Sequence, residues 1–141
     1  MSEHEILREA RSRELEQALF YRTLAGLAED DGDGPLAERL NELLADEQHH
    51  VSRLTARLLE LGQSPGGTRP EAPQVYLDGW LGEAETREAA EVAWYEDALA
   101  RVEDSATAGV LREILESERN HLHALGGKWM SASAQPTEND A

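Results

Sequence analysis

Apolar residues along the chain recur at spacings of three and four positions, which is the period of an amphipathic α-helix. The strand-like alternation of Val, Ile and Thr is missing, and Ala, Leu, Glu and Arg dominate the composition. Four segments carry the helical period, at about residues 4–29, 35–62, 76–103 and 106–130. Short polar segments separate the first from the second and the third from the fourth, so each pair is predicted to form an antiparallel hairpin.

A longer segment, at about residues 63–80, joins the two hairpins and is rich in proline and glycine. It is too long for a hairpin turn, and we interpret it as a crossover that runs along the bundle. The sequence therefore predicts an all-α protein, an antiparallel four-helix bundle over residues 1–130. The last segment, residues 131–141, is polar and small and is predicted to be a disordered tail.

The first and third helical segments repeat one pattern, written "RELEQALFY" in residues 13–21 and "REAAEVAWY" in residues 87–95. A shift of 74 positions (88 − 14) superposes them. In each copy a glutamate lies seven positions before a tyrosine, and these pairs are Glu14 with Tyr21 and Glu88 with Tyr95.

The second and fourth segments also superpose, with a shift of 71 positions (118 − 47). This shift brings Glu47 onto Glu118 and His50 onto His121, so each segment holds one Glu-x-x-His pair. Residues three apart lie on the same face of a helix, which lets one pair share a ligand. A single such pair is weak evidence in a chain rich in glutamate, but two in repeat-equivalent places are specific. The chain is therefore predicted to be two copies of one helical hairpin.

The repeated polar residues lie on the seams that the helices are expected to turn toward the core. Each apolar seam is interrupted near its middle by one glutamate, and in the second and fourth segments also by a histidine. The expected seams are Glu14, Ala18, Tyr21, Ala25 and Ala28; Leu40, Leu43, Glu47, His50 and Leu54; Glu88, Val92, Tyr95, Leu99 and Val102; and Leu111, Ile114, Glu118, His121 and Leu125.

Four buried carboxylates would repel one another, and each would lose its hydration at a cost of several kcal/mol. Two divalent cations would neutralise them, and two neutral imidazoles would complete the coordination. This is the ligand set of a di-iron carboxylate bundle. The predicted ligands are Glu14, Glu47, His50, Glu88, Glu118 and His121. Carboxylate oxygen with imidazole nitrogen suits iron or manganese, and zinc is an alternative.

With these motifs the chain resembles the ferritin-like superfamily of di-iron proteins, in the style of rubrerythrin and bacterioferritin, over about residues 5–128. Its second half is also similar to encapsulated ferritin. The resemblance implies two iron ions, with Fe(II) and O₂ or H₂O₂ as reactants. It implies terminal ligation by Glu14 and Glu88, bridging by Glu47 and Glu118, and one metal for each of His50 and His121.

Two further glutamates of the third helical segment and two tyrosines have alternative roles. Rubrerythrins use an additional glutamate of the third helix, and Glu85 and Glu91 both lie three residues from Glu88. We expect neither to be a ligand, because exposed glutamates are common in this chain. Tyr21 and Tyr95 are candidate catalytic residues that could relay electrons or hydrogen-bond a ligand, and core packing is an equal alternative.

Composition restricts the function. The chain contains no cysteine, which excludes thiolate ligands and a cysteine-rich electron-transfer module, so a peroxide reductase would need an external electron donor. The net charge of −16 argues against a nucleic-acid partner or an anionic membrane surface. No apolar run or signal segment is visible, so a cytoplasmic location is expected, and cargo inside a protein compartment is a further idea by analogy.

The predicted function is oxidation of Fe(II) with O₂ or H₂O₂, as in a ferroxidase or a rubrerythrin-like peroxide reductase. The alternatives are a di-iron oxidase or hydroxylase acting on a substrate, and a non-enzymatic helical bundle that binds zinc or a partner. A homodimer or a higher homo-oligomer is expected.

Overall fold

The computed structural model describes residues 1–67 and 69–126. They form four helices and no strand: α1 (Glu3–Asp30), α2 (Gly34–Glu60), α3 (Trp80–Leu99) and α4 (Ser105–Leu125). The all-α four-helix prediction is confirmed, whereas residues 127–130 of the predicted bundle and the predicted tail, 131–141, lie outside the described residues. None of these four helices is long and apolar enough to cross a membrane.

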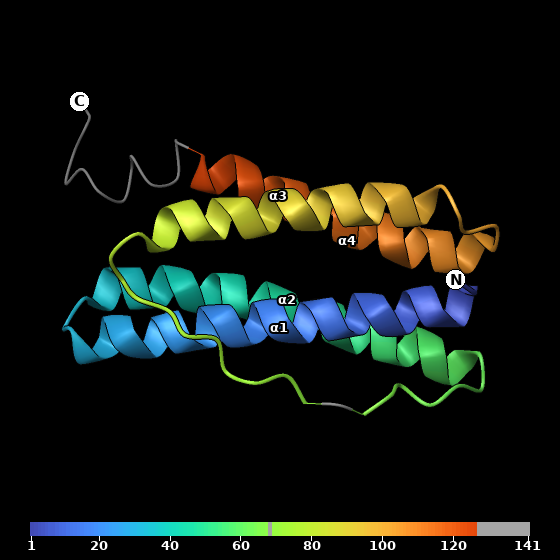
Figure 1. The fold of residues 1–141 in the computed structure, drawn as a ribbon, viewed down its shortest axis with the longest axis horizontal. Coiled ribbons are helices and arrows are strands. Elements are labelled where there is room, and N and C mark those ends of the chain that lie inside the picture. The colour runs from blue at the N-terminus through green and yellow to red at the C-terminus, as the bar shows by residue number, and fades with distance from the viewer. Residues whose placement is uncertain (68, 127–141) are drawn as a thin grey trace.

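The helices form an elongated bundle of two hairpins (Figure 1). α1 packs most extensively on α2 and α3 on α4, while fewer contacts join α1 to α3 and α2 to α4. The crossover leaves the end of α2 and runs back along the bundle beside α1 before α3 begins. Because the crossover spans the bundle's length, α2 and α3 run in the same direction, and all four packed pairs are antiparallel.

Polar side chains cap three of the four helices at their N-termini. Ser2 and Glu5 form a capping box on α1, in which the Ser2 hydroxyl accepts from the Glu5 N–H and the Glu5 carboxylate accepts from the Ser2 N–H. Asp33 accepts from the Leu36 N–H at the start of α2. Asp104 accepts from the Thr107 N–H at the start of α4.

The third helix is shorter than predicted. It was expected at about residues 76–103 but begins at Trp80 and ends at Leu99. Gly79 has a φ of 77° in the left-handed region, so the helix cannot extend back through it. The crossover therefore occupies residues up to 79, and the apolar pattern before Trp80 belongs to the loop: Val75 is buried in the core.

The seam predicted for α3 is partly wrong. Val92 and Leu99 are only half buried, whereas Glu91 and Ala98 are buried. The buried face of α3 is Ala84, Glu88, Glu91, Tyr95 and Ala98. These residues are also spaced alternately by four and three positions. Glu88 and Tyr95 lie in both the predicted and the observed face, but Glu91 and Ala98 are buried where Val92 and Leu99 were predicted. Small and polar side chains therefore face the bundle here. The seams predicted for α1, α2 and α4 are buried throughout.

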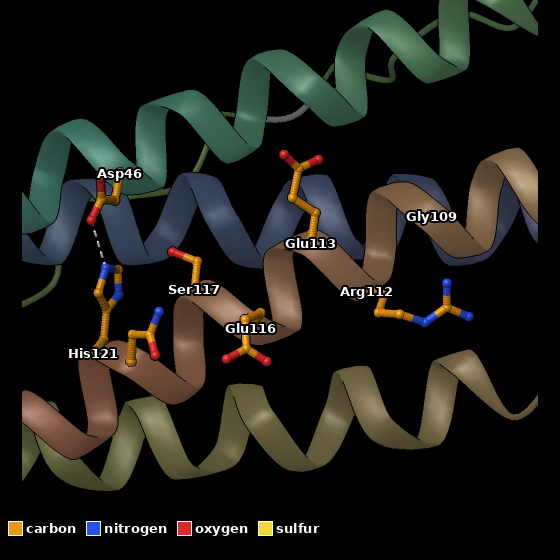
Figure 2. Close-up of a pocket in the computed structure, with 8 residues that line it drawn as sticks. Asp46, Gly109, Arg112, Glu113, Glu116, Ser117 and His121 are labelled. Atoms are coloured by element: carbon orange, nitrogen blue, oxygen red, sulfur yellow. Dashed lines mark hydrogen bonds and ion pairs between the residues drawn. The ribbon is translucent and has the colours of Figure 1, made fainter.

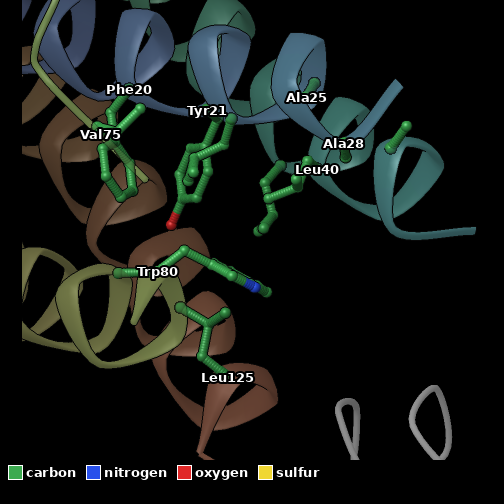
Figure 3. Close-up of a cluster of buried hydrophobic side chains, with 12 residues drawn as sticks. Phe20, Tyr21, Ala25, Ala28, Leu40, Val75, Trp80 and Leu125 are labelled. Carbon is green, nitrogen blue, oxygen red and sulfur yellow. The ribbon is translucent and has the colours of Figure 1, made fainter. Parts of the chain in front are cut away.

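Two apolar clusters fill the bundle, one toward each end. One contains Phe20, Tyr21 and Leu40 with Val75, Trp80 and Leu125 (Figure 3). The other contains Ile6, Leu7 and Leu54 with Tyr95, Leu111 and Ile114. Each cluster includes one of the two tyrosines, and the buried polar residues lie between the clusters. The apolar core thus encloses a polar centre and keeps bulk water from both of its ends.

Replacing Leu54 by Ala should lower the free energy of unfolding by about 2–5 kcal/mol, because its fully buried side chain would leave a cavity. Leu59→Ala is the matched control on the same helix, since Leu59 is 60% exposed, and it should change stability by no more than about 0.5 kcal/mol. Urea unfolding of both variants measures the difference. Equal losses would contradict the assigned face of α2.

Candidate metal centre

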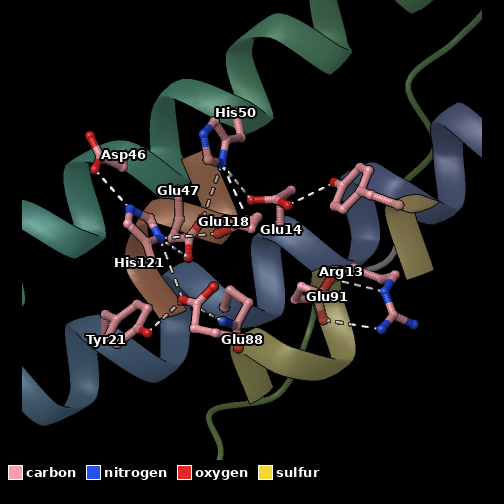
Figure 4. A network of polar contacts seen from close by, with 12 residues as sticks. Arg13, Glu14, Tyr21, Asp46, Glu47, His50, Glu88, Glu91, Glu118 and His121 are labelled. Carbon is pink, nitrogen blue, oxygen red and sulfur yellow. Dashed lines mark hydrogen bonds and ion pairs between the residues drawn. The ribbon is translucent and has the colours of Figure 1, made fainter. Parts of the chain in front are cut away.

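All six predicted ligands meet in the middle of the bundle (Figure 4). Every helix contributes: one glutamate each from α1 and α3, and one Glu-x-x-His pair each from α2 and α4. The four glutamates have no solvent exposure, and the two histidines are 4% and 6% exposed. The residues are Glu14, Glu47, His50, Glu88, Glu118 and His121.

The six residues form two overlapping groups, each able to surround one ion. In one group Glu14 and His50 join Glu47 and Glu118, and in the other Glu88 and His121 join the same two glutamates. Within each group the potential ligand atoms lie within 4.8 Å of one another. Glu47 and Glu118 belong to both groups, which is the position required of carboxylates that bridge two metals.

Both histidines present their Nδ1 atoms to the carboxylates. His50 Nδ1 lies 3.0 Å from Glu14 Oε1 and 3.1 Å from Glu47 Oε1. His121 Nδ1 lies 3.0 Å from Glu118 Oε1 and 3.5 Å from Glu88 Oε2. The imidazole rings are tilted by 32° with centroids 6.4 Å apart. Nδ1 is therefore the nitrogen of each ring that faces the centre.

The two tyrosines bind the glutamates of the opposite repeat. Tyr21 of α1 donates to Glu88 Oε2 of α3 at 2.6 Å, and Tyr95 of α3 donates to Glu14 Oε2 of α1 at 2.7 Å. Both side chains are fully buried. The seven-residue interval within each helix therefore serves a contact between helices, which the sequence repeat alone did not indicate.

Side chains of the two repeats also contact each other outside the centre. The guanidinium of Arg13 lies over the ring of Trp94, 5.2 Å from its centroid. Its repeat equivalent, Arg87 (13 + 74), lies over the ring of Phe20 at 4.3 Å. These cation–π pairs hold α1 against α3 on either side of the glutamates. The structure thus gives the sequence repeat an approximate two-fold symmetry in space.

Burial and mutual repulsion disturb the acid–base properties of the centre. Burial, together with the charge of Glu14, raises the pKa of Glu47 to about 8. Burial and the charges of Glu47 and Glu14 also raise the pKa of Glu118 well above its usual range. Burial alone would lower the pKa of His50, but its hydrogen bonds to the carboxylates outweigh burial and raise it to about 12. The raised pKa values of Glu47 and His50 favour their protonated forms near neutral pH in the metal-free centre.

Three carboxylate oxygens in the centre have no hydrogen-bond partner among the described residues, namely Glu47 Oε2, Glu88 Oε1 and Glu118 Oε2. Buried oxygens of this kind are costly unless a donor or a cation satisfies them. They are carried by both bridging candidates and by one terminal candidate. The donor set, four carboxylates and two imidazoles, fits divalent ions of the iron and manganese type.

The two additional third-helix glutamates differ. Glu91 was expected to be exposed, but it is 7% exposed and forms a bidentate pair with Arg13, with N–O distances of 3.0 and 3.1 Å. Burial raises the pKa of Glu91 to about 7, against the effect of Arg13. Glu85 is half buried. Neither residue belongs to the two groups of potential ligands.

Two polar residues near the centre escaped the sequence analysis. Gln17, which occupies the repeat position of Glu91, is buried and donates to Glu88 Oε2 at 3.3 Å. Asp46 lies 2.9 Å from His121 Nε2 through its Oδ2 atom, and this hydrogen bond lowers the pKa of Asp46. Gln17 follows Glu14 by three positions and Asp46 precedes Glu47, so proximity to a ligand was the available signal.

The Asp46–His121 pair lies at the surface opening of the centre. A groove of about 620 Å³ between α2 and α4 is lined by both residues and by Glu113 and Glu116 (Figure 2). A second hollow of about 230 Å³ reaches the same pair from the side of Leu43. The imidazole of His121 therefore separates an acidic surface groove from the buried carboxylates.

Comparison with known proteins bears on this arrangement. A family model described as Rubrerythrin matches residues 5–126. Among solved structures, the fold is similar to that of a bacterioferritin from Desulfovibrio desulfuricans, whose diiron site was studied in different catalytic states. The TM-score is 0.82 at 24% identity, over 88% of this chain and 75% of that chain. The Mycobacterium tuberculosis bacterioferritin BfrA gives a TM-score of 0.82 at 20% identity, over 88% of this chain and 81% of that chain.

A search of curated protein sequences found no match. The family model nevertheless covers nearly the whole described bundle, including all four helices and every residue of the centre. The predicted ferritin-like fold is confirmed by the similarity to both bacterioferritin structures. The chain therefore belongs to the rubrerythrin family of ferritin-like proteins.

Proposed function

We propose that the protein is a di-iron oxidoreductase that couples the oxidation of Fe(II) to the reduction of O₂ or H₂O₂. Its centre would hold two iron ions, with Glu14 and His50 on one ion and Glu88 and His121 on the other. Glu47 and Glu118 would bridge them. When bound, the two ions supply the electrons that reduce the oxidant.

One observation carries this proposal: four fully buried glutamates converge with two histidines in groups that share two carboxylates. Within those groups three carboxylate oxygens lack a hydrogen-bond partner in the described chain. A purely structural polar core would satisfy its oxygens with protein donors, since an unmet buried acceptor costs about 1–3 kcal/mol. Two divalent ions would meet all three oxygens and balance the charge of four ionised glutamates.

The surrounding residues would position the ligands. The hydroxyls of Tyr21 and Tyr95 each hold one oxygen of a terminal glutamate, which leaves the other oxygen of that carboxylate for a metal. Asp46 accepts from His121 Nε2, which fixes the tautomer with its Nδ1 lone pair toward the centre. We therefore propose that the two tyrosines position the glutamates. Electron relay by Tyr21 and Tyr95 stays a prediction.

Access to the centre would follow the groove between α2 and α4. Its lining of Asp46, Glu113 and Glu116 attracts Fe(II), and O₂ or H₂O₂ is small enough to pass where His121 meets the surface. Because the chain has no cysteine, reduction of the ferric centre would require a separate electron donor. The cytoplasmic location and the homo-oligomer stay predictions.

The first test is metal stoichiometry, measured by anaerobic calorimetry with Fe(II) and with redox-inactive Mn(II). The wild-type chain should bind two ions, one for each group of ligands. Glu14→Gln and Glu88→Gln should each lose one site, whereas Glu47→Gln should weaken both by at least about tenfold, because a bridging carboxylate serves both ions. Glu16→Gln, an exposed position on α1, is the control. A wild-type chain that binds one ion, or none, would refute the assignment.

The second test is proton release on metal binding. The folded, metal-free chain holds protons at pH 7 on Glu47 (pKa about 8) and His50 (pKa about 12) that the unfolded chain has largely released. These bound protons stabilise the folded state fully below the unfolded pKa of each group, which is 4.5 for Glu47 and 6.5 for His50. The stabilisation is lost as pH rises through the raised pKa of each group in the folded state. Metal-free stability should therefore fall between about pH 5 and pH 8, while metal affinity rises.

Titrations in two buffers of different ionisation enthalpy measure the protons released. Identical heats in both buffers would contradict the proposal.

The third test compares the two oxidants. Fe(II)-loaded protein, mixed rapidly with O₂ or with H₂O₂, should form ferric iron at a rate followed by near-ultraviolet absorbance. Glu47→Ala should slow this oxidation at least about tenfold, while Glu16→Ala should not. A rate with H₂O₂ far above that with O₂ would assign a peroxide reductase, and the opposite ratio a ferroxidase. Unchanged oxidation in Glu47→Ala would remove the centre from the reaction.

A further inference from the structure

A second groove, of about 660 Å³, lies between the crossover and the outer faces of α1 and α2. Its basic lining is Arg11, Arg22 and Arg69, and apolar side chains of Leu15, Leu19 and Val51 form part of its floor. We call this surface the arginine groove. It contains none of the six residues of the candidate metal centre.

The charge of the arginine groove is opposite to that of the chain. Acidic residues number 29 of 141, and the net charge is −16, yet none of the described residues that line this groove is acidic. The groove between α2 and α4, by contrast, is lined by three carboxylates, Asp46, Glu113 and Glu116, and by one arginine, Arg112. The two surfaces therefore present opposite charges to small ions.

Among the described residues, the three arginines also have no carboxylate ion-pair partner. Six other arginines form ion pairs with carboxylates among the described residues, namely Arg13, Arg53, Arg57, Arg87, Arg101 and Arg119. Arg11 instead donates through Nε to the neutral Thr55 hydroxyl at 2.8 Å, and Arg22 and Arg69 form no ion pair within the described chain. In the part of the chain that the structure describes, no carboxylate therefore pairs with these three guanidinium groups, although acidic residues are in large excess.

The wall formed by the crossover is anchored at both ends. Arg8 of α1 donates to the Ser64 carbonyl at 3.1 Å and to the Gln63 side chain at 2.8 Å. At the other end, Val75 is buried in the apolar cluster near Trp80. The later part of the crossover passes over α1 on its way to α3 (Figure 1). Arg69 of the crossover lines the groove together with Arg11 and Arg22 of α1.

We propose that the arginine groove binds a small organic phosphate, a phosphate monoester with an apolar substituent. Guanidinium groups form paired, charge-assisted hydrogen bonds with phosphate oxygens, and three of them match a dianion better than a single carboxylate. Leu15, Leu19 and Val51 provide contact for the apolar part. The volume lies within the range of small-molecule pockets, about 300–1,000 Å³. The site is independent of the metal centre and of its proposed reaction.

The test is an NMR titration of the full chain with three probes at about 0.15 M salt, where the charge of the rest of the chain is screened beyond about 8 Å. The probes are inorganic phosphate, phenyl phosphate and phenol. Phenyl phosphate should bind more tightly than phosphate, phenol should not bind, and the amide shifts should concentrate at Gly66, Gly67 and Val51.

Arg22→Gln and Arg69→Gln should each weaken phenyl phosphate binding about tenfold, which is the effect of losing one charge-assisted hydrogen bond. Arg112→Gln is the matched control, because it removes the same charge from an exposed arginine beside the acidic groove. Equal weakening in the control, or shifts spread over the surface, would overturn the proposal. So would an absence of shifts together with a sedimentation mass that falls in Arg22→Gln, since a second chain would then cover the groove.

Discussion

The burial of four glutamates against one another is the constraint on which the rest of the structure depends. Each would lose its hydration and repel the other three, and the apolar clusters at both ends of the bundle exclude the water that could screen them. Two histidines, two tyrosine hydroxyls and one glutamine amide contact the carboxylates. Even so, three carboxylate oxygens have no hydrogen-bond partner in the described chain. The protein groups thus leave hydrogen-bond acceptors of the candidate metal centre unsatisfied.

The approximate two-fold symmetry makes this concentration of charge compatible with one fold. Each helical hairpin contributes the same ligands, and each supplies the tyrosine that the other hairpin's glutamate requires. The halves differ where Gln17 in α1 is replaced by Glu91 in α3, and Arg13 neutralises the extra acid. They differ again at Asp46, whose repeat equivalent is Ser117 (46 + 71). The two groups of potential metal ligands are therefore similar in their residues but not in their surroundings.

Charge is also divided over the outside of the bundle. The groove beside His121 carries carboxylates, whereas the arginine groove beneath the crossover carries three guanidinium groups that form no ion pair with the described carboxylates. A strongly acidic chain attracts cations over most of its surface. The arginine groove differs because the crossover adds Arg69 to the arginines of α1. The crossover has this effect in addition to its topological role of returning the chain to the start of α3.

The sequence by itself determined the four helices, their pairing into hairpins and the six residues that meet at the centre. It could do so because helical period and internal repeat are local properties, and residues three or seven apart share a face whatever surrounds them. Only the tertiary structure decided that Tyr21 binds Glu88 rather than its neighbour Glu14, that Glu91 is buried against Arg13, and that α3 begins at Trp80. These features depend on how one helix is rotated against another and where a loop packs. Contacts between distant segments set that rotation, and no pattern within a single helix records it.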